Sequence, residues 1–362
     1  MANRGAEIWK LGAMKTWRIP GKTASIMTTV IIGAIVVLPL ASCTTAAHKA
    51  SPHHASSHHG HTAGHVRRPG RRGAPVLVLG HGPVFGVYRP KLPESRKVTR
   101  WITRNLHPQI VELYTKFGTR FPSRAVRSNY AHGAMTLVQL DPWTVPLYRI
   151  ATGKYDAYLR RYARAVAAVR VRIGFSFAHE MNGQWYPWDF RKSGPANFVA
   201  AWRRIHRIFG AMHAKKVTWV WTINKLYLRD SRPLAQVTRE DWPGKRYVNW
   251  IGVDGYFRFP GEPFGRVMSP TLRLVRSITR KPVLFTETAV YPNSLIYVQM
   301  RELFAGIERD HLLGFIYFDH NARRRWELHG KAIGLLQRLL RRYGYKRLAC
   351  SRNVCKPTAR TR

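Results

Sequence analysis

Two glutamates, Glu180 and Glu287, occupy positions where catalytic carboxyl groups are expected. Each follows a short apolar segment, 173–178 or 282–286, at the point where a strand-like stretch gives way to a loop. A protonated carboxyl beside an ionised one can cleave a glycosidic bond: the first protonates the leaving oxygen and the second attacks the sugar carbon or activates water. Two carboxyls suffice for this reaction, so we expect no metal and no organic cofactor.

Aromatic side chains near these carboxyls could form a surface for sugars. Trp185 and Trp188 follow Glu180 within one loop, and Trp143 follows the apolar segment 135–140. Tryptophans usually belong to the core, but packing accounts less well for two of them in a loop directly after a strand. We therefore expect these three to bind substrate.

The elements that must position these residues alternate between strand-like and helix-like segments from about residue 76. The expected strands are 84–88, 125–130, 135–140, 173–178, 217–223, 250–256, 283–286 and 313–318. The expected helices are 95–117, 154–168, 196–212, 264–279, 295–309 and 330–343. Eight strands alternating with helices predict an α/β fold of the (β/α)8 TIM barrel type over residues 76–346. A doubly wound open sheet is the alternative, but no Gly-rich phosphate loop follows the first strand.

Five acidic residues fall at the expected C-terminal ends of strands or just beyond them, where barrel enzymes build their active sites. Besides Glu180 and Glu287 they are Asp141, Asp254 and Asp319. For Asp141 and Asp319, a helix cap or a pairing with one of the many arginines is an equally good explanation.

The motif His179-Glu180-Met181-Asn182-Gly183, followed by Trp185-Tyr186-Pro187-Trp188, resembles glycoside hydrolase family 26. This family contains endo-acting β-mannanases with some β-glucanases and β-xylanases. The segments 250–256 and 282–288 support the resemblance. It implies a retaining double displacement in which Glu180 is the acid/base and Glu287 the nucleophile.

The resemblance also implies roles for the neighbours of the two glutamates. His179 shapes the innermost sugar subsite, Tyr256 donates a hydrogen bond to the nucleophile, and Trp185 contacts substrate. Asn182 is a further expected substrate-binding residue. One departure concerns 317–320, Tyr-Phe-Asp-His, where mannanase-type members usually place a tryptophan under the reacting sugar. The identity of the sugar therefore stays open.

The leading hypothesis is a secreted or surface-tethered endo-β-glycanase that hydrolyses internal β-1,4-mannosidic bonds. A β-1,3-1,4-glucanase or xylanase of the same family is one alternative. The other is a non-catalytic protein that binds a polysaccharide of the cell envelope.

The charge balance is extreme, with 61 Lys and Arg against 18 Asp and Glu and a net charge of +43. The basic residues are scattered, and no nucleic-acid-binding motif organises them. We therefore expect an anionic membrane or cell-wall surface as a partner, no nucleic acid, and a monomer.

The N-terminus has the features of an export signal over residues 1–43. Residues 1–22 are basic, residues 24–40 are mostly apolar, and Cys43 ends a stretch that resembles the bacterial lipoprotein box. The resemblance implies lipidation of Cys43 and an extracellular, membrane-anchored protein. An ordinary cleaved signal and an uncleaved membrane anchor are the alternatives.

Two further segments flank the barrel. Residues 44–75 contain seven histidines without apolar periodicity and are expected to form a flexible linker with no specific metal site. Residues 347–362 form a basic tail in which Cys350 and Cys355 could pair as a disulfide or remain as thiols.

Overall fold

The computed structural model describes residues 83–90, 106, 108–227, 231–321, 325–345, 348–351 and 354–357 of the 362-residue chain. The export signal, Cys43 and the histidine-rich linker lie outside these residues, so their predictions stay untested. The predicted barrel boundaries at 76 and 346 also lie outside. Among the described residues, no helix has both the length and the apolar character needed to cross a membrane.

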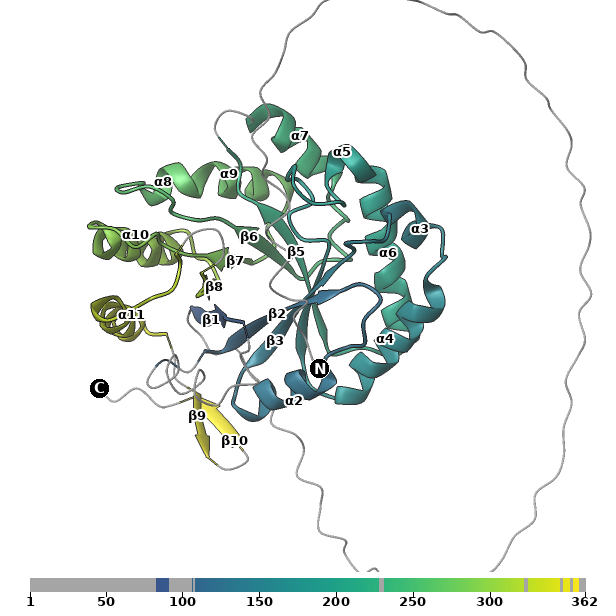
Figure 1. Ribbon diagram of the computed structural model, residues 1–362, viewed down its shortest axis with the longest axis horizontal. Coiled ribbons are helices and arrows are strands. Elements are labelled where there is room, and N and C mark those ends of the chain that lie inside the picture. Colours follow the sequence, from purple (N-terminus) through teal and green to yellow (C-terminus); the bar gives the residue numbers. More distant parts are fainter. Residues whose placement is uncertain are drawn as a thin grey trace, which may run out of the picture. The chain divides into compact units, whose positions relative to one another are not determined.

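Eight parallel strands close into a barrel in chain order, so the predicted (β/α)8 fold is confirmed (Figure 1). The strands are β1 (Val84–Tyr88), β2 (Ile110–Lys116), β3 (Met135–Asp141), β4 (Ile173–Phe177), β5 (Val217–Asn224), β6 (Trp250–Asp254), β7 (Val283–Thr288) and β8 (Gly314–Phe318). Strand β1 pairs with β8, and Val84 lies opposite Gly314. A Cβ atom on Gly314 would lie 1.9 Å from the carbonyl oxygen of Val84, and φ at Gly314 is 138°. Closure in this geometry therefore requires a glycine.

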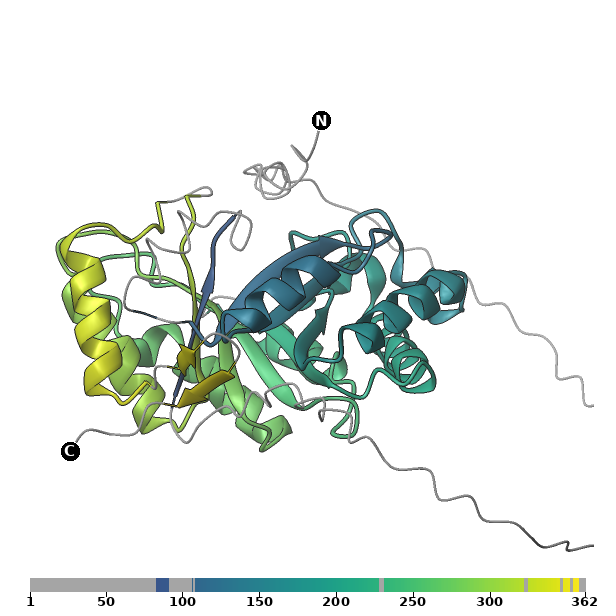
Figure 2. The same cartoon turned by 90° about the horizontal axis from the view of Figure 1, so that it is seen from below.

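From β2 onwards, described helices follow the strands and lie around the barrel (Figure 1), and Figure 2 shows the same elements from below. They are α2 (Ser123–Ala131), α3 (Leu147–Ala151), α4 (Asp156–Val169), α5 (Phe190–Ser193), α6 (Pro195–Ala211), α7 (Ser231–Glu240), α8 (Phe264–Val267), α9 (Ser269–Ile278), α10 (Ile296–Arg309) and α11 (Lys331–Arg342). The outward face of β4 shows why they attach. Phe175 contacts Phe209 of α6, and Phe177 contacts Phe198 of the same helix. Burial of these rings joins sheet to helix.

The barrel interior changes from apolar to polar along the strands. Near the strand starts, apolar side chains form one buried cluster: Val84, Ile110, Met135, Leu137, Val220, Leu284 and Ile316. Farther along, Gln139 donates to Glu112 at 2.8 Å and Ser176 donates to Thr222 at 3.1 Å. The apolar layer holds the barrel together, and the polar layer brings hydrogen-bonding groups towards the C-terminal ends of the strands.

Two predicted elements were wrong. One predicted strand is a helix and part of one predicted helix is a strand, so the number of strands is still eight. Residues 110–116, predicted as part of a helix over 95–117, form β2, and residues 125–130, predicted as a strand, lie in α2. In β2 the barrel supplies hydrogen-bonding partners for the polar side chains of Glu112 and Tyr114. In α2 the buried residues Val126 and Asn129 are three apart, which is helical spacing.

Other boundaries shift by a few residues. The helix predicted over 264–279 is two helices, α8 and α9, and Pro270 lies in the first turn of α9, where proline is well tolerated. Near the C-terminus, β9 (Leu348–Ser351) pairs antiparallel with β10 (Val354–Pro357), and the register places Cys350 opposite Cys355. The disulfide between them stays a prediction.

Candidate active site

Glu180 follows β4 in a tight backbone turn. The strand ends at Phe177, and both Ala178 and Glu180 adopt positive φ, 50° and 53°. The N–H of Glu180 donates to the carbonyl of Thr222 at 3.0 Å, which ties the turn to β5. Residues other than glycine adopt this conformation rarely, and strained positions of this kind gather at functional sites. The sequence carries no signal of this turn.

Two N–H donors hold the carboxyl group of Glu180. Asn224, the last residue of β5, donates from Nδ2 to Oε1 at 2.5 Å, and Trp185 donates from Nε1 to Oε2 at 2.8 Å. Gly183 makes room for the indole, because a Cβ there would lie 2.7 Å from the Trp185 ring. Sequence analysis predicted Trp185 in the site but missed Asn224, whose position at a strand end was the available signal.

Two tyrosine hydroxyls hold the carboxyl group of Glu287, which lies near the end of β7. Tyr114 of β2 donates to Oε1, and Tyr256, just beyond β6, donates to Oε2. Burial, aided by neighbouring carboxylates, raises the pKa of both tyrosines well above 10. Both hydroxyls therefore stay protonated and stabilise the carboxylate form of Glu287. Sequence analysis placed Tyr256 beside Glu287 but missed Tyr114, because its segment was taken for a helix.

His179 lies between the two glutamates. Its Nδ1 is 2.8 Å from Oδ1 of Asp141, and its Nε2 is 3.1 Å from the Tyr186 hydroxyl and 4.0 Å from Oε1 of Glu287. Burial by itself lowers the pKa of His179, but the charge and hydrogen bond of Asp141, with the charges of Glu180 and Glu287, outweigh burial and raise it to about 9. At neutral pH the ring is therefore an imidazolium that favours carboxylates around it.

Asp254 is a third buried carboxyl beside Glu287, directly opposite it on β6. It accepts a hydrogen bond from Thr286 at 2.6 Å. Burial, followed by the charges of Glu287 and Glu180, raises its pKa well above 3.8. The carboxyl therefore resists ionisation next to Glu287.

Among the described residues, one group could hold a metal ion. It consists of His179, Asp254 and Glu287, whose ligand atoms lie within 4.8 Å of one another. A metal binds the neutral imidazole and the ionised carboxylate. The raised pKa values of His179 and Asp254 favour the opposite forms. Protons therefore compete with a metal for these atoms, and the expectation that no metal is needed stays a prediction.

Access to the two glutamates is narrow. Glu180 exposes 6% of its surface and Glu287 only 1%. Tyr114, Trp185 and Trp143 remain half-buried. A substrate therefore reaches the carboxyl of Glu287 only through a small opening or after a neighbouring side chain moves.

Two residues predicted to bind substrate, Trp188 and Asn182, form hydrogen bonds that support the site. Trp188 is 1% exposed, donates to the carbonyl of His179 at 2.7 Å and stacks on Tyr186 with centroids 4.4 Å apart. Asn182, also 1% exposed, donates to the carbonyl of Asn224 and accepts from its N–H. Hydrogen bonds fasten both side chains into the scaffold behind His179 and Asn224, and their predicted contact with substrate stays a prediction.

The loop after β8 contributes a tryptophan that sequence analysis missed. Trp326 lies with its ring centroid 5.0 Å from that of Tyr256. Asp319 holds this loop, since it pairs with Arg89 at 2.6 Å and accepts from the N–H of Leu328 at 2.9 Å. Asp319 therefore pairs with an arginine and supports a loop, whereas Asp141 binds His179 within the site.

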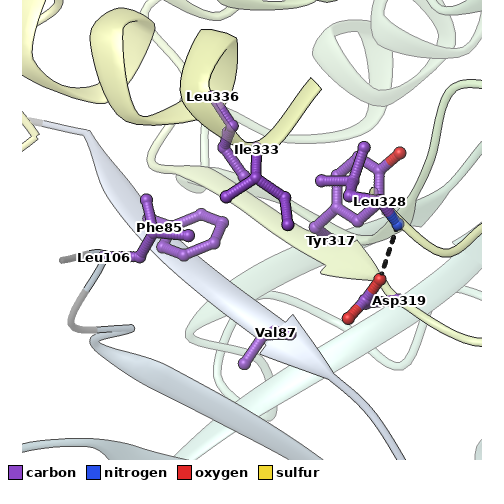
Figure 3. Close-up of a pocket in the computed structure, with 8 residues that line it drawn as sticks. All are labelled: Phe85, Val87, Leu106, Tyr317, Asp319, Leu328, Ile333 and Leu336. Atoms are coloured by element: carbon purple, nitrogen blue, oxygen red, sulfur yellow. Dashed lines mark hydrogen bonds between the residues drawn. The ribbon is translucent and has the colours of Figure 1, made fainter. Parts of the chain in front are cut away.

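A small cavity of about 20 Å³ lies between β1, β8 and α11, with Asp319 at its edge (Figure 3). Its other lining residues are apolar or aromatic: Phe85, Val87, Leu106, Tyr317, Leu328, Ile333 and Leu336. A space of this size has room for roughly one water molecule. It is too small for a sugar and is a packing gap between barrel and helix.

Replacing Asp141 with Asn is expected to lower the pKa of His179 from about 9 by roughly 1–2 units, because the charge that opposes desolvation disappears. His179 has a raised folded-state pKa, so the stability that its charged form contributes is complete below pH 6.5 and disappears as pH rises through 9. The Asp141→Asn variant should lose this stability at a lower pH than the parent protein. NMR titration of the imidazole protons measures the shift, and a parent titration near pH 6.5 would contradict the assignment.

Comparison with known proteins points to one family. Residues 151–287, from the end of α3 to Glu287, match the model of Glycosyl hydrolase family 26. The chain is 31% identical over 171 residues to Endoglucanase H of Acetivibrio thermocellus; the match covers 44% of this chain but only 18% of that much longer protein.

Solved structures with the same fold include two mannanases. A GH26 β-mannanase from Bacteroides ovatus matches with a TM-score of 0.54 and 15% identity, covering 75% of this chain and 90% of its own. A modular endo-β-1,4-mannanase from Cellulomonas fimi matches with a TM-score of 0.57 and 16% identity, covering 71% and 70%. At these identities the likeness shows the fold alone.

Proposed function

We infer the function of this protein from its membership of glycoside hydrolase family 26, whose model matches residues 151–287. We propose that it is an endo-β-glycanase that hydrolyses internal β-1,4-mannosidic bonds with retention of anomeric configuration. The observation that carries the proposal is the convergence of Glu180 and Glu287 on His179, each carboxyl held by two side-chain donors.

The surroundings of the two carboxyls support a division of roles. Glu287 has two hydroxyl donors and the imidazolium of His179 4.0 Å away, which together stabilise its anion. An anion suits the nucleophile. Glu180 is held by the N–H donors of Asn224 and Trp185, which orient its carboxyl group, and the resemblance of the His179-Glu180 motif to the family assigns it the role of acid/base. A protonated carboxyl suits the general acid.

The reaction proceeds in two steps. In the first, Glu180 donates its proton to the glycosidic oxygen while Glu287 attacks the anomeric carbon, so the bond to the leaving sugar breaks and a glycosyl ester forms. In the second, Glu180 removes a proton from water, the water oxygen attacks the anomeric carbon, and Glu287 leaves as a carboxylate. Two inversions at one carbon restore the original configuration.

Two candidate substrates have support, a β-mannan and a β-glucan. The two solved relatives are named as mannanases, and Trp326 beside Tyr256 offers an indole near the site even though 317–320 lacks one. The curated relative is named as an endoglucanase, which keeps a β-glucan as the second candidate. Release of reducing sugar from mannan, mixed-linkage glucan and xylan separates these candidates.

Retention is tested by proton NMR of the first product. The β-anomer should form first and equilibrate later with the α-anomer. Initial formation of the α-anomer would exclude the double displacement, and release of no sugar from any polysaccharide would exclude the glycanase itself.

Surface attachment is also a proposal, supported by the basic segment 1–22, the apolar segment 24–40 and Cys43. Incorporation of labelled palmitate in a bacterial host tests it. The label should appear in the parent and be lost in Cys43→Ala.

A further inference from the structure

Two cations flank one tyrosine beside the candidate active site. The Nζ of Lys225 lies 4.6 Å from the ring centroid of Tyr227, and Cζ of Arg258 lies 5.8 Å from the same centroid. All three residues are half-buried. Cations within about 6 Å of a ring centroid interact with the aromatic face, so these contacts hold both charged groups close to one ring.

The cations belong to the same strand ends that hold the two glutamates. Lys225 directly follows Asn224, which donates to Glu180, and Arg258 lies two residues after Tyr256, which donates to Glu287. The N–H of Lys225 donates to the carbonyl of Asp254 at 2.8 Å and so joins β5 to β6. The pair is therefore part of the same C-terminal face of the barrel.

An aromatic contact links the pair to the carboxyl of Glu180. The ring of Tyr227 meets that of Trp185 edge to face, with centroids 6.5 Å apart. Trp185 in turn donates to Glu180 at 2.8 Å. Trp185 therefore connects the carboxyl of Glu180 to Tyr227 and the two cations.

The positive charge here is poorly compensated. Among the described residues no carboxylate forms an ion pair with Lys225 or Arg258, and the buried Nε of Arg258 has no hydrogen-bond partner. The nearest acid, Glu262, uses Oε2 to accept the backbone N–H groups of Arg258 and Phe259. Burial, followed by the charge of Arg258, lowers the pKa of Lys225 despite Glu262. A bound anion would relieve this repulsion.

We propose that Lys225, Tyr227 and Arg258 form a subsite for an acidic sugar, in which the sugar's carboxylate binds the two cations that the Tyr227 ring holds together. Arginine offers a planar fork that matches a carboxylate, and lysine adds a point charge. The substrate class is then a β-glycan that bears uronic acid residues. This inference rests on the proposed glycanase function and specifies its substrate.

The test compares binding of an acidic glycan with binding of the same glycan after its charge is removed. Glucuronomannan and glucuronoxylan are used before and after chemical reduction of their carboxyl groups to hydroxymethyl groups. Full-length protein carrying Glu287→Gln prevents turnover, and native affinity electrophoresis gives Kd. A sulfated mannan distinguishes a carboxylate requirement from a general anion requirement.

The net charge of +43 attracts any polyanion, so the variants need a charge-matched control. Lys225→Met with Arg258→Gln removes two charges at the subsite. Arg124→Gln with Arg127→Gln removes two from the exposed face of α2. If circular dichroism shows that this double variant does not fold, the single variant Lys225→Met is used to test the subsite.

The starting protein should bind one of the acidic glycans about tenfold more tightly than its reduced form, as expected for charge-assisted hydrogen bonds. The subsite variant should lose this ratio, and the α2 control should keep it. Tighter binding of the sulfated mannan than of either uronate glycan would overturn the carboxylate assignment. The subsite would be overturned if the affinity ratio of acidic to reduced glycan were the same in the subsite variant and the α2 control. It would also be overturned if this ratio were near one in the starting protein. If native protein releases no sugar from any glycan, the proposed function fails, but the binding ratio still decides the inference.

Discussion

Replacing Glu287 with Gln is expected to lower kcat on β-glycan by roughly 10⁴-fold or more, because the amide cannot form the glycosyl ester. The change preserves shape and removes only the charge that Tyr114 and Tyr256 stabilise. Release of reducing sugar from mannan measures the loss. Glycan binding should persist, since the nucleophile contributes to the chemical step more than to affinity.

The control for this variant is Glu308→Gln, which makes the same chemical change at an exposed position of α10. It should keep full activity. Parental activity in Glu287→Gln would refute the role of Glu287, and equal losses in both variants would point to a general effect of the substitution. The alternative of a non-catalytic polysaccharide-binding protein predicts that even the parent releases no sugar.

Replacing Glu180 with Gln is expected to lower kcat on natural glycans by roughly 10²- to 10⁴-fold, the range for loss of a general acid. A dinitrophenyl glycoside should suffer much less in formation of the glycosyl ester, because its leaving group departs without a proton. Azide, which needs no general base, should then speed breakdown of the ester and yield a glycosyl azide. Burst kinetics with the aryl substrate measure the two steps separately.

This second prediction has its own internal control. In Glu287→Gln, neither a good leaving group nor azide should restore activity through the ester, because no ester forms. Equal losses on the aryl and natural substrates for Glu180→Gln would contradict its role as general acid.

Local sequence patterns were sufficient for most of the fold. Apolar segments of four to seven residues alternate with amphipathic ones, and this alternation predicted seven of the eight strands at nearly their observed positions. It failed at 110–116 because Glu112 and Tyr114 are polar residues that face the interior. A pattern that equates polar with exposed must misread a strand whose polar side chains find their partners inside the barrel.

The candidate site was likewise predicted only in part from the sequence. Glu180 and Glu287 could be chosen from the sequence because each follows an apolar segment in a chain poor in acids. Two of the donors that hold them, Trp185 and Tyr256, were also predicted from the sequence. The other two were not, since Tyr114 is 173 positions from Glu287 and Asn224 is 44 from Glu180. Such pairs exist only after the barrel closes.

The sequence by itself determined the barrel, the position of its two principal carboxyl groups and the strong positive charge, because these depend on local periodicity and composition. Tertiary structure decided that Tyr114 and Asn224 also hold those carboxyls, that Trp188 and Asn182 bond to the scaffold of the site, and that Lys225 and Arg258 meet at one tyrosine. These features depend on closure of the barrel, which brings distant strand ends to one face and decides which side chains remain within reach of a substrate.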